Sequence, residues 1–190
     1  MNQSISLLSP FSSILIFFLV LNFFMGVTVK GDIISTQCKN VSTHDFQVNY
    51  DFCVSSLEGN PQSKTSDIFG LAVISMELCL NNATNIPTYI DSILKDGKAE
   101  QGARVCLGNC IEFYSMAIRE VQQAIKDFSG KDYAAALFSL GAAMDSSETC
   151  KDGFTEAGVD FGILRKQYED FFQLEAISLG IITNINGPLQ

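Results

Sequence analysis

The strongest constraint on the fold is a stripe of apolar residues that recurs every three or four positions between residues 99 and 128. Its members are Ile111, Tyr114, Ile118, Val121, Ile125 and Phe128. Because an α-helix has about 3.6 residues per turn, this spacing places all six side chains on one side of one long helix. Such a one-sided helix is typical of a helical bundle, in which other helices cover the apolar side.

The segment before this stripe has a similar pattern over residues 66–94. The expected N-cap lies at Ser66-Asp67, because short polar side chains such as these accept hydrogen bonds from the free N–H groups of the first turn. Pro87 is expected to bend or interrupt the helix, since proline lacks a backbone N–H. Gly97 is expected to supply the turn into the next helix.

Two further helices are expected after the stripe. Gly130 is expected to end the helix of residues 99–128 as its C′ residue, and Asp132 to cap an Ala-rich helix that ends near Cys150. The last helix is expected over residues 162–184. Its expected buried residues are Leu164, Tyr168, Phe171, Leu174, Ile177, Ile181 and Ile185.

Four long helices joined by short turns predict an all-α fold, namely an antiparallel up-down-up-down four-helix bundle over residues 63–186. Residues 32–62 precede the bundle and contain two cysteines and two short apolar patches. They are expected to form a small helical hairpin that lies against the bundle. Disulfides are expected to staple this fold.

The N-terminus predicts entry into the secretory pathway. Residues 11–25 are almost entirely apolar, and this run is shorter than the roughly 20 residues that a membrane-spanning helix needs. We therefore expect residues 1–31 to be a signal peptide cleaved near Gly31, with an uncleaved anchor as the alternative. The remaining residues 32–190 are expected to form one secreted domain in the apoplast or cell wall, with the vacuole as the alternative destination.

Six cysteines in an oxidising compartment are expected to form mostly disulfides. Cys38 and Cys53 enclose 14 residues, and a bond between them would contribute about 3 kcal/mol through loop closure. Cys110 and Cys150 would be brought level by a helical hairpin, where their bond would contribute roughly 4 kcal/mol.

Four stretches of the chain resemble the plant invertase and pectin methylesterase inhibitors. They are Asn49-Tyr50-Asp51-Phe52-Cys53, Gly70-Leu71-Ala72-Val73-Ile74-Ser75, Lys131-Asp132-Tyr133-Ala134 and Ser147-Glu148-Thr149-Cys150-Lys151-Asp152-Gly153-Phe154. Within the family, the chain is most similar to the pollen-allergen type of invertase inhibitor. The resemblance covers the whole mature chain and implies a four-helix bundle, an N-terminal hairpin and the same two disulfide pairs, and it implies an inhibitor rather than an enzyme.

Cys79 and Cys106 remain, and helix geometry argues against a bond between them. If the chain turns near Gly97, Cys79 lies 18 residues before the turn and Cys106 only 9 after it. At 1.5 Å rise per residue the mismatch is roughly 13 Å, which exceeds the Cα separation of a disulfide. Both are expected to be buried free thiols.

The sequence contains few residues that could form a catalytic site or a metal site. His44 is the single histidine, and it lies outside the predicted bundle, so catalytic triads and histidine-ligated metal centres are not expected. Cys106 and Cys110 share a helix face but lack a second ligand pair. No cofactor and no metal are expected.

The expected mature chain is acidic, because removal of residues 1–31 leaves 11 Lys and Arg against 21 Asp and Glu. This charge disfavours nucleic-acid partners, and no membrane contact is expected after signal cleavage. An acidic run lies near the end of the third long helix and is expected to be a solvated surface, with a docking surface for a basic enzyme as the alternative. It consists of Asp145, Glu148, Asp152 and Glu156.

Two sequons make N-glycosylation available to a secreted chain. They are Asn40-Val41-Ser42 and Asn82-Ala83-Thr84. Asn40 is the favoured acceptor because it lies in a polar stretch, whereas Asn82 falls within a predicted helix. The sequence therefore predicts a glycoprotein.

Lys131, Asp132 and Tyr133 are the candidate inhibitory contact. Invertase inhibitors resemble one another in a Pro-Lys-Phe tripeptide at the corresponding turn, which enters the active site of the invertase, and this chain departs from that pattern. The structural alternative is an N-cap aspartate followed by a core tyrosine.

The resemblance therefore predicts an inhibitor of a secreted plant carbohydrate-modifying enzyme that covers the enzyme's substrate cleft. Pectin methylesterase is slightly preferred as the target because the tripeptide is absent, with acid invertase as the alternative. A small apolar-ligand carrier, or a bundle without an inhibitory target, is the alternative of another class.

Overall fold

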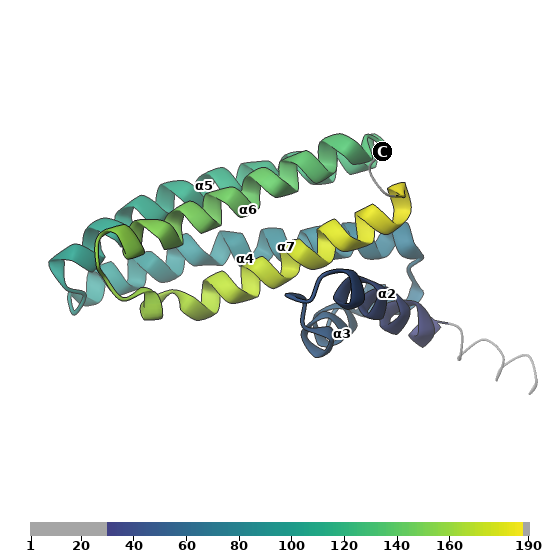
Figure 1. Ribbon diagram of the computed structural model, residues 1–190, viewed down its shortest axis with the longest axis horizontal. Coiled ribbons are helices and arrows are strands. Elements are labelled where there is room, and N and C mark those ends of the chain that lie inside the picture. Colours follow the sequence, from purple (N-terminus) through teal and green to yellow (C-terminus); the bar gives the residue numbers. More distant parts are fainter. Residues whose placement is uncertain (1–29, 188–190) are drawn as a thin grey trace, which may run out of the picture.

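Four long helices run side by side through the molecule, and a short helical hairpin lies across one end of them (Figure 1). The computed structural model describes residues 30–187, and these contain helices without strands. The elements are α2 (Lys30–His44), α3 (Tyr50–Glu58), the 3₁₀ turn η1 (Pro61–Thr65), α4 (Ile68–Asp96), α5 (Gln101–Ser129), α6 (Tyr133–Glu156), the 3₁₀ turn η2 (Phe161–Ile163) and α7 (Arg165–Asn186). The predicted signal peptide lies outside the described residues up to residue 29.

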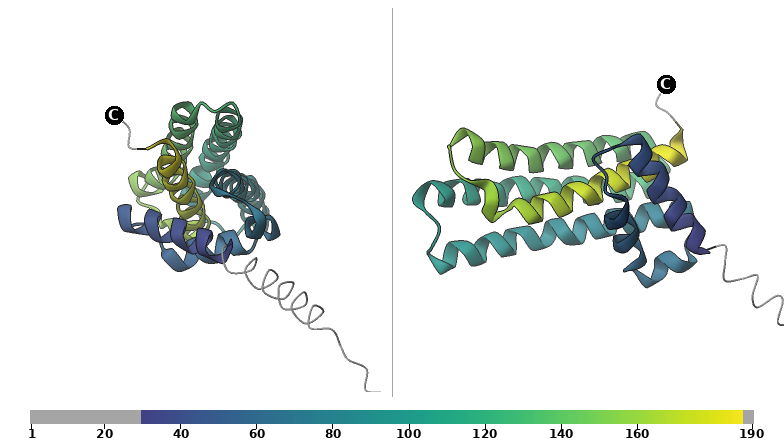
Figure 2. Two further views of the ribbon diagram at one scale, coloured as in Figure 1. Left: turned by 90° about the vertical axis from the view of Figure 1, so that its right-hand side faces the viewer. Right: turned by 60° about the horizontal axis from the view of Figure 1, so that its bottom comes forward.

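Helices α4 to α7 form the bundle, in which each helix runs antiparallel to the one before it (Figures 1 and 2). Helix α5 packs between α4 and α6, and α7 closes the bundle against α4 and α6. The predicted up-down-up-down bundle is therefore confirmed. Within the bundle the large side chains Tyr114, Phe154 and Phe171 are fully buried.

The helix termini follow the local chemistry of the sequence. Asp67 accepts a hydrogen bond from the N–H of Gly70 at 2.9 Å and so caps α4. Asp132 accepts one from the N–H of Ala135 at 3.0 Å and caps α6. Gly97 ends α4 in the left-handed conformation, with φ of 72°, a backbone shape that glycine adopts without a steric penalty.

The expected interruption at Pro87 was wrong, because α4 continues through this residue as one helix from Ile68 to Asp96. Buried side chains on both sides of the proline, Ala83, Ile86 and Ile90, hold this part of the helix in the core. The packing therefore outweighs the loss of one backbone hydrogen bond.

The apolar stripe of α5 is rotated slightly from its predicted position. Tyr114, Val121 and Phe128 are buried, but Ile111, Ile118 and Ile125 are only partly buried. Ala117 and Ala124 complete the buried line, because small side chains let the neighbouring helices approach closely. In α7, Tyr168 and Ile185 are likewise half-buried rather than fully buried.

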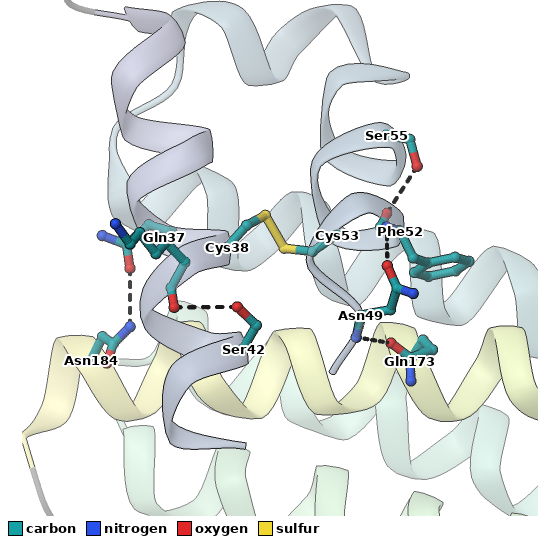
Figure 3. Close-up of a disulfide and its surroundings, with 10 residues drawn as sticks. Gln37, Cys38, Ser42, Asn49, Phe52, Cys53, Ser55, Gln173 and Asn184 are labelled. Carbon is teal, nitrogen blue, oxygen red and sulfur yellow. Dashed lines mark hydrogen bonds between the residues drawn. A yellow bond between two sulfur atoms is a disulfide. The ribbon is translucent and has the colours of Figure 1, made fainter. Parts of the chain in front are cut away.

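The N-terminal hairpin, α2 and α3, forms as predicted and is fastened to α7. Gln173 of α7 bridges both sides of the loop, since its Oε1 accepts from the N–H of Asn49 at 2.8 Å and its Nε2 donates to the carbonyl of Gln47 at 2.7 Å. Further along α7, Asn184 donates to Gln37 of α2 at 3.1 Å (Figure 3). The hairpin therefore holds a fixed position against the bundle.

Candidate functional site

The turn between α5 and α6, residues 130–133, is named the Lys131 turn here. The N–H of Asp132 donates to the carbonyl of Asp127 at 2.9 Å. The N–H of Lys131 donates to the carbonyl of Phe128, also at 2.9 Å. This pair of bonds is the Schellman pattern that ends many helices, and it places Lys131, rather than Gly130, at the C′ position.

The expected role of Gly130 was therefore wrong. Gly130 keeps a right-handed helical conformation, with φ of −75°, and Lys131 has φ of 66°. Asp132 is already the cap of α6, so only Gly130 and Lys131 lie between the last residue of α5 and this cap, and Lys131 is the one that takes the left-handed conformation. A residue with a Cβ adopts this conformation at a cost of roughly 1–2 kcal/mol.

Lys131 is the single non-glycine residue with positive φ in the part of the chain that the structure describes. Its side chain is exposed, and none of the ion pairs among the described residues includes it. A strained residue that persists at an exposed tip points to a function. Here it presents an unpaired cation to solvent.

An aromatic cluster lies beside this cation. The ring of Tyr133 lies 5.1 Å from that of Phe128 and 6.4 Å from that of Phe69, measured between centroids. Phe69 is 46% exposed, and the three rings and Lys131 border a surface hollow of about 490 Å³. The Lys131 turn therefore combines a projecting cation with an apolar, partly exposed recess.

The cysteines have the partners that the sequence and the resemblance indicate. Cys38 is joined to Cys53, with 5.7 Å between their Cα atoms, and Figure 3 shows this bond between α2 and α3. Cys110 is joined to Cys150, with 4.9 Å between Cα atoms, and links α5 to α6. Cys79 and Cys106 are buried free thiols.

Metal-binding clusters and membrane-spanning helices are both missing from residues 30–187. No three His, Cys, Asp or Glu side chains in this range gather to hold a metal ion. Cys106 instead donates a weak hydrogen bond to the carbonyl of Gly153 at 3.6 Å. No helix in the same range combines the length and the apolarity needed to cross a membrane.

Three members of the acidic run, Asp145, Asp152 and Glu156, are exposed as expected, but Glu148 is half-buried and ties α6 to α7. The Nζ atom of Lys151 lies 2.6 Å from Glu148 Oε2 and 3.1 Å from the Tyr168 hydroxyl. The Tyr168 hydroxyl also donates to Glu148. Burial raises the pKa of the Glu148 carboxyl, but the hydrogen bonds from Lys151 and Tyr168 outweigh it, and the net pKa is lowered.

The sequons and the histidine lie on helices. Asn40 is exposed near the end of α2, and its carbonyl accepts from Nδ1 of His44 at 2.8 Å. Asn82 lies inside α4, where its Oδ1 atom is enclosed and without a hydrogen-bond partner. His44 is exposed at the end of α2, outside the bundle core.

One buried acid was not anticipated from the sequence. Glu175 of α7 is 0% exposed, and neither carboxyl oxygen has a hydrogen-bond partner among the described residues. Burial, and secondarily the charge of Asp145, raises the pKa of Glu175 well above 4.5. The sequence did contain a sign that Glu175 is buried, because this residue lies inside the apolar stripe of α7, between Leu174 and Ala176.

Comparisons with known proteins identify relatives of this chain. The profile of the family described as "Plant invertase/pectin methylesterase inhibitor" matches residues 32–181. A "Putative invertase inhibitor" from Platanus acerifolia is 41% identical over 169 residues, which cover 89% of this chain and 94% of that protein. "Pectinesterase inhibitor 12" from Arabidopsis thaliana is 33% identical over 149 residues, covering 76% and 82% of the two chains.

The fold is also similar to that of a solved structure. The crystal structure of a mutant form of a pectin methylesterase inhibitor from Arabidopsis superposes with a TM-score of 0.62. The match covers 76% of this chain and 95% of that chain at 21% identity. At this identity the likeness concerns the fold alone.

Proposed function

Because this chain belongs to the plant invertase/pectin methylesterase inhibitor family, we propose that it inhibits a secreted plant carbohydrate-modifying enzyme by inserting the Lys131 turn into the enzyme's substrate cleft. The family consists of inhibitors of enzymes. In this proposal no covalent bond is made or broken. The bundle, held by two disulfides, acts as a rigid body that excludes the substrate.

The observation that carries the proposal is the strained, exposed and unpaired Lys131 at the tip of the bundle. Clefts that hydrolyse glycosidic bonds contain a pair of carboxyl groups, so a projecting cation is complementary to them. The neighbouring recess of Phe69, Phe128 and Tyr133 offers apolar contact area beside the cation. Binding energy in protein interfaces is concentrated in a few such anchors.

We propose acid invertase, a glycoside hydrolase, as the target. The support is the 41% identical relative from Platanus acerifolia, whose name refers to invertase inhibition. This reverses the slight preference for pectin methylesterase in the sequence analysis. Pectin methylesterase stays the second candidate, because the Pro-Lys-Phe tripeptide is absent and a 33% identical relative is named a pectinesterase inhibitor.

The remaining proposals concern location and domain bounds. We propose that residues 1–31 are removed during secretion and that residues 32–190 act as one domain in the cell wall, or alternatively in the vacuole. The family match begins at residue 32, which supports this boundary. A carrier that holds apolar ligands inside the bundle is disfavoured because Tyr114, Phe154 and Phe171 occupy the interior.

The test is inhibition of purified acid invertase and purified pectin methylesterase by the secreted protein. We expect invertase to be inhibited, and we expect Lys131→Glu to weaken inhibition at least 10-fold, which corresponds to about 1.4 kcal/mol. Lys126→Glu, on the exposed surface of the last turn of α5, is the matched control and should change inhibition little.

Three results would count against the proposal. Inhibition of pectin methylesterase alone would establish the second candidate as the target. Equal effects of the two lysine substitutions would show that the Lys131 turn is not the inhibitory contact. Full activity of both enzymes with micromolar protein would overturn the proposed function.

A further inference from the structure

A groove with a volume of about 570 Å³ lies between the N-terminal hairpin and α7. Helix α2 and the loop after it form one wall, and α7 forms the other, with Met144 of α6 between them. Figure 2 shows how the hairpin lies across the end of α7. This groove is built from elements other than the Lys131 turn, so the proposed inhibitory contact does not use it.

The two walls also pack directly against each other where Val41 of α2 meets Gly180 of α7. A Cβ atom on Gly180 of α7 would lie 2.5 Å from Cγ1 of Val41, which is far inside van der Waals contact. Only glycine therefore allows α2 to approach α7 this closely. Asn40, the residue before Val41, lines the groove beside this crossing.

Asn40 is also the acceptor of a sequon, Asn40-Val41-Ser42. Its side chain is exposed, and its backbone carbonyl accepts from Nδ1 of His44. We propose that Asn40 carries an N-linked glycan and that the first sugars of this glycan occupy the groove between α2 and α7. Asn82, whose amide oxygen is enclosed in α4, stays unmodified in the folded protein.

The chemistry of the groove matches a sugar. Phe172 and Leu179 of α7, with Met144, contribute apolar side chains to its lining, and Asp45 and Gln47 contribute polar groups. A pyranose ring has the same two parts, namely apolar C–H faces and hydroxyl groups at its edge. The volume lies within the range of about 300–1,000 Å³ that suits small ligands, so it accommodates the sugars nearest to the protein.

An exposed aromatic residue beside the groove supports the same occupant. Phe46 is 93% exposed and lies between Asp45 and Gln47, both of which line the groove. A glycan on Asn40 would cover this part of the loop and tie the hairpin to α7.

The modification itself is a group transfer during secretion. Nδ2 of Asn40 forms a bond to C1 of the first N-acetylglucosamine and loses one proton. The bond between C1 and the lipid-linked diphosphate donor breaks, and the diphosphate leaves. The hydroxyl of Ser42 completes the motif that the transferase recognises.

The experiment compares three chains secreted from a eukaryotic host, namely wild type, Ser42→Ala and Ser42→Thr. Ser42→Ala removes the sequon and keeps Asn40, whereas Ser42→Thr keeps the sequon. Peptide mass mapping should find glycan on Asn40 in wild type and Ser42→Thr, and none on Asn82. Thr84→Ala, which removes the second sequon, should leave the mass of attached glycan unchanged.

Occupancy of the groove is read by amide hydrogen exchange. After enzymatic trimming to a single N-acetylglucosamine, α2 and the C-terminal half of α7 should exchange at least several-fold more slowly in wild type than in Ser42→Ala. The same pair made in bacteria, without glycan, should exchange equally. An unmodified Asn40, equal exchange in the secreted pair, or the same difference in the bacterial pair would each overturn the proposal, and none of these outcomes bears on enzyme inhibition.

Discussion

The buried carboxyl of Glu175 predicts that the fold loses stability as the pH rises. The charge of Asp145 on α6 adds to the effect of burial on this carboxyl, and the carboxyl in turn raises the pKa values of two neighbouring groups, Cys79 of α4 and Tyr114 of α5. None of them is a cation. The carboxyl is fully buried and has no hydrogen-bond partner, so the folded protein favours its neutral, protonated form.

The sign of the effect follows from proton binding. Burial raises the pKa of Glu175 in the folded state well above 4.5, so the unfolded chain releases this proton at a lower pH than the folded protein does. The stabilisation is fully present below about pH 4.5 and is lost as the pH rises toward the folded-state pKa. Within that window the free energy of unfolding falls by about 1.4 kcal/mol per pH unit from this group alone.

The assay is denaturant unfolding at several pH values for wild type and Glu175→Gln. The amide has nearly the same shape and does not titrate, so the variant should lack the decline that Glu175 causes and should gain stability relative to wild type as the pH rises. Glu169→Gln, an exposed position on the same helix, is the control and should follow wild type. Parallel pH profiles for wild type and Glu175→Gln would refute the reasoning.

Three further substitutions test the staple, the hairpin crossing and the strained turn. Cys150→Ser should lower the free energy of unfolding by about 2–5 kcal/mol and make Cys110 reactive to a thiol reagent, and an unchanged denaturation midpoint would contradict this. Gly180→Ala places a methyl group against Val41 and should speed hydrogen exchange in α2, whereas unaltered exchange would show that the crossing tolerates a Cβ. Lys131→Gly should raise the free energy of unfolding by about 1 kcal/mol, because glycine adopts positive φ without strain, and a lower denaturation midpoint would count against the strain.

Much of the fold was predictable because apolar residues recur every three or four positions in a helix that packs on one side. The stripe through Tyr114, Val121 and Phe128 located α5, and the cap candidates Ser66-Asp67 and Asp132 marked where two helices start. These signals are local. Each depends on residues within one or two turns of the same helix, so no tertiary structure is needed to read them.

The errors arose where packing between helices decides the outcome. Pro87 has a strong local tendency to break a helix, but the buried side chains around it keep α4 continuous. Gly130 is the natural residue for a left-handed helix end, yet the cap at Asp132 moves that conformation to Lys131. Packing decides the first feature and the position of the next helix cap decides the second, and the propensity of the single residue includes neither.

The functional features were predictable only in part. The resemblance pointed to Lys131, Asp132 and Tyr133, but not to the backbone strain at Lys131 or to the contact of Tyr133 with Phe69. The groove beside Asn40 joins segments more than 100 residues apart in the sequence. Such a site exists only after α2 has packed on α7, so no local pattern records it.

The measurement that tests the central claim most directly is the steady-state kinetics of acid invertase over a range of sucrose concentrations, with and without the secreted protein. An inhibitor that covers the substrate cleft competes with sucrose, so the apparent KM should rise linearly with the free inhibitor concentration while kcat stays constant. A fall in kcat with unchanged KM would show that the protein binds away from the cleft and would contradict the account.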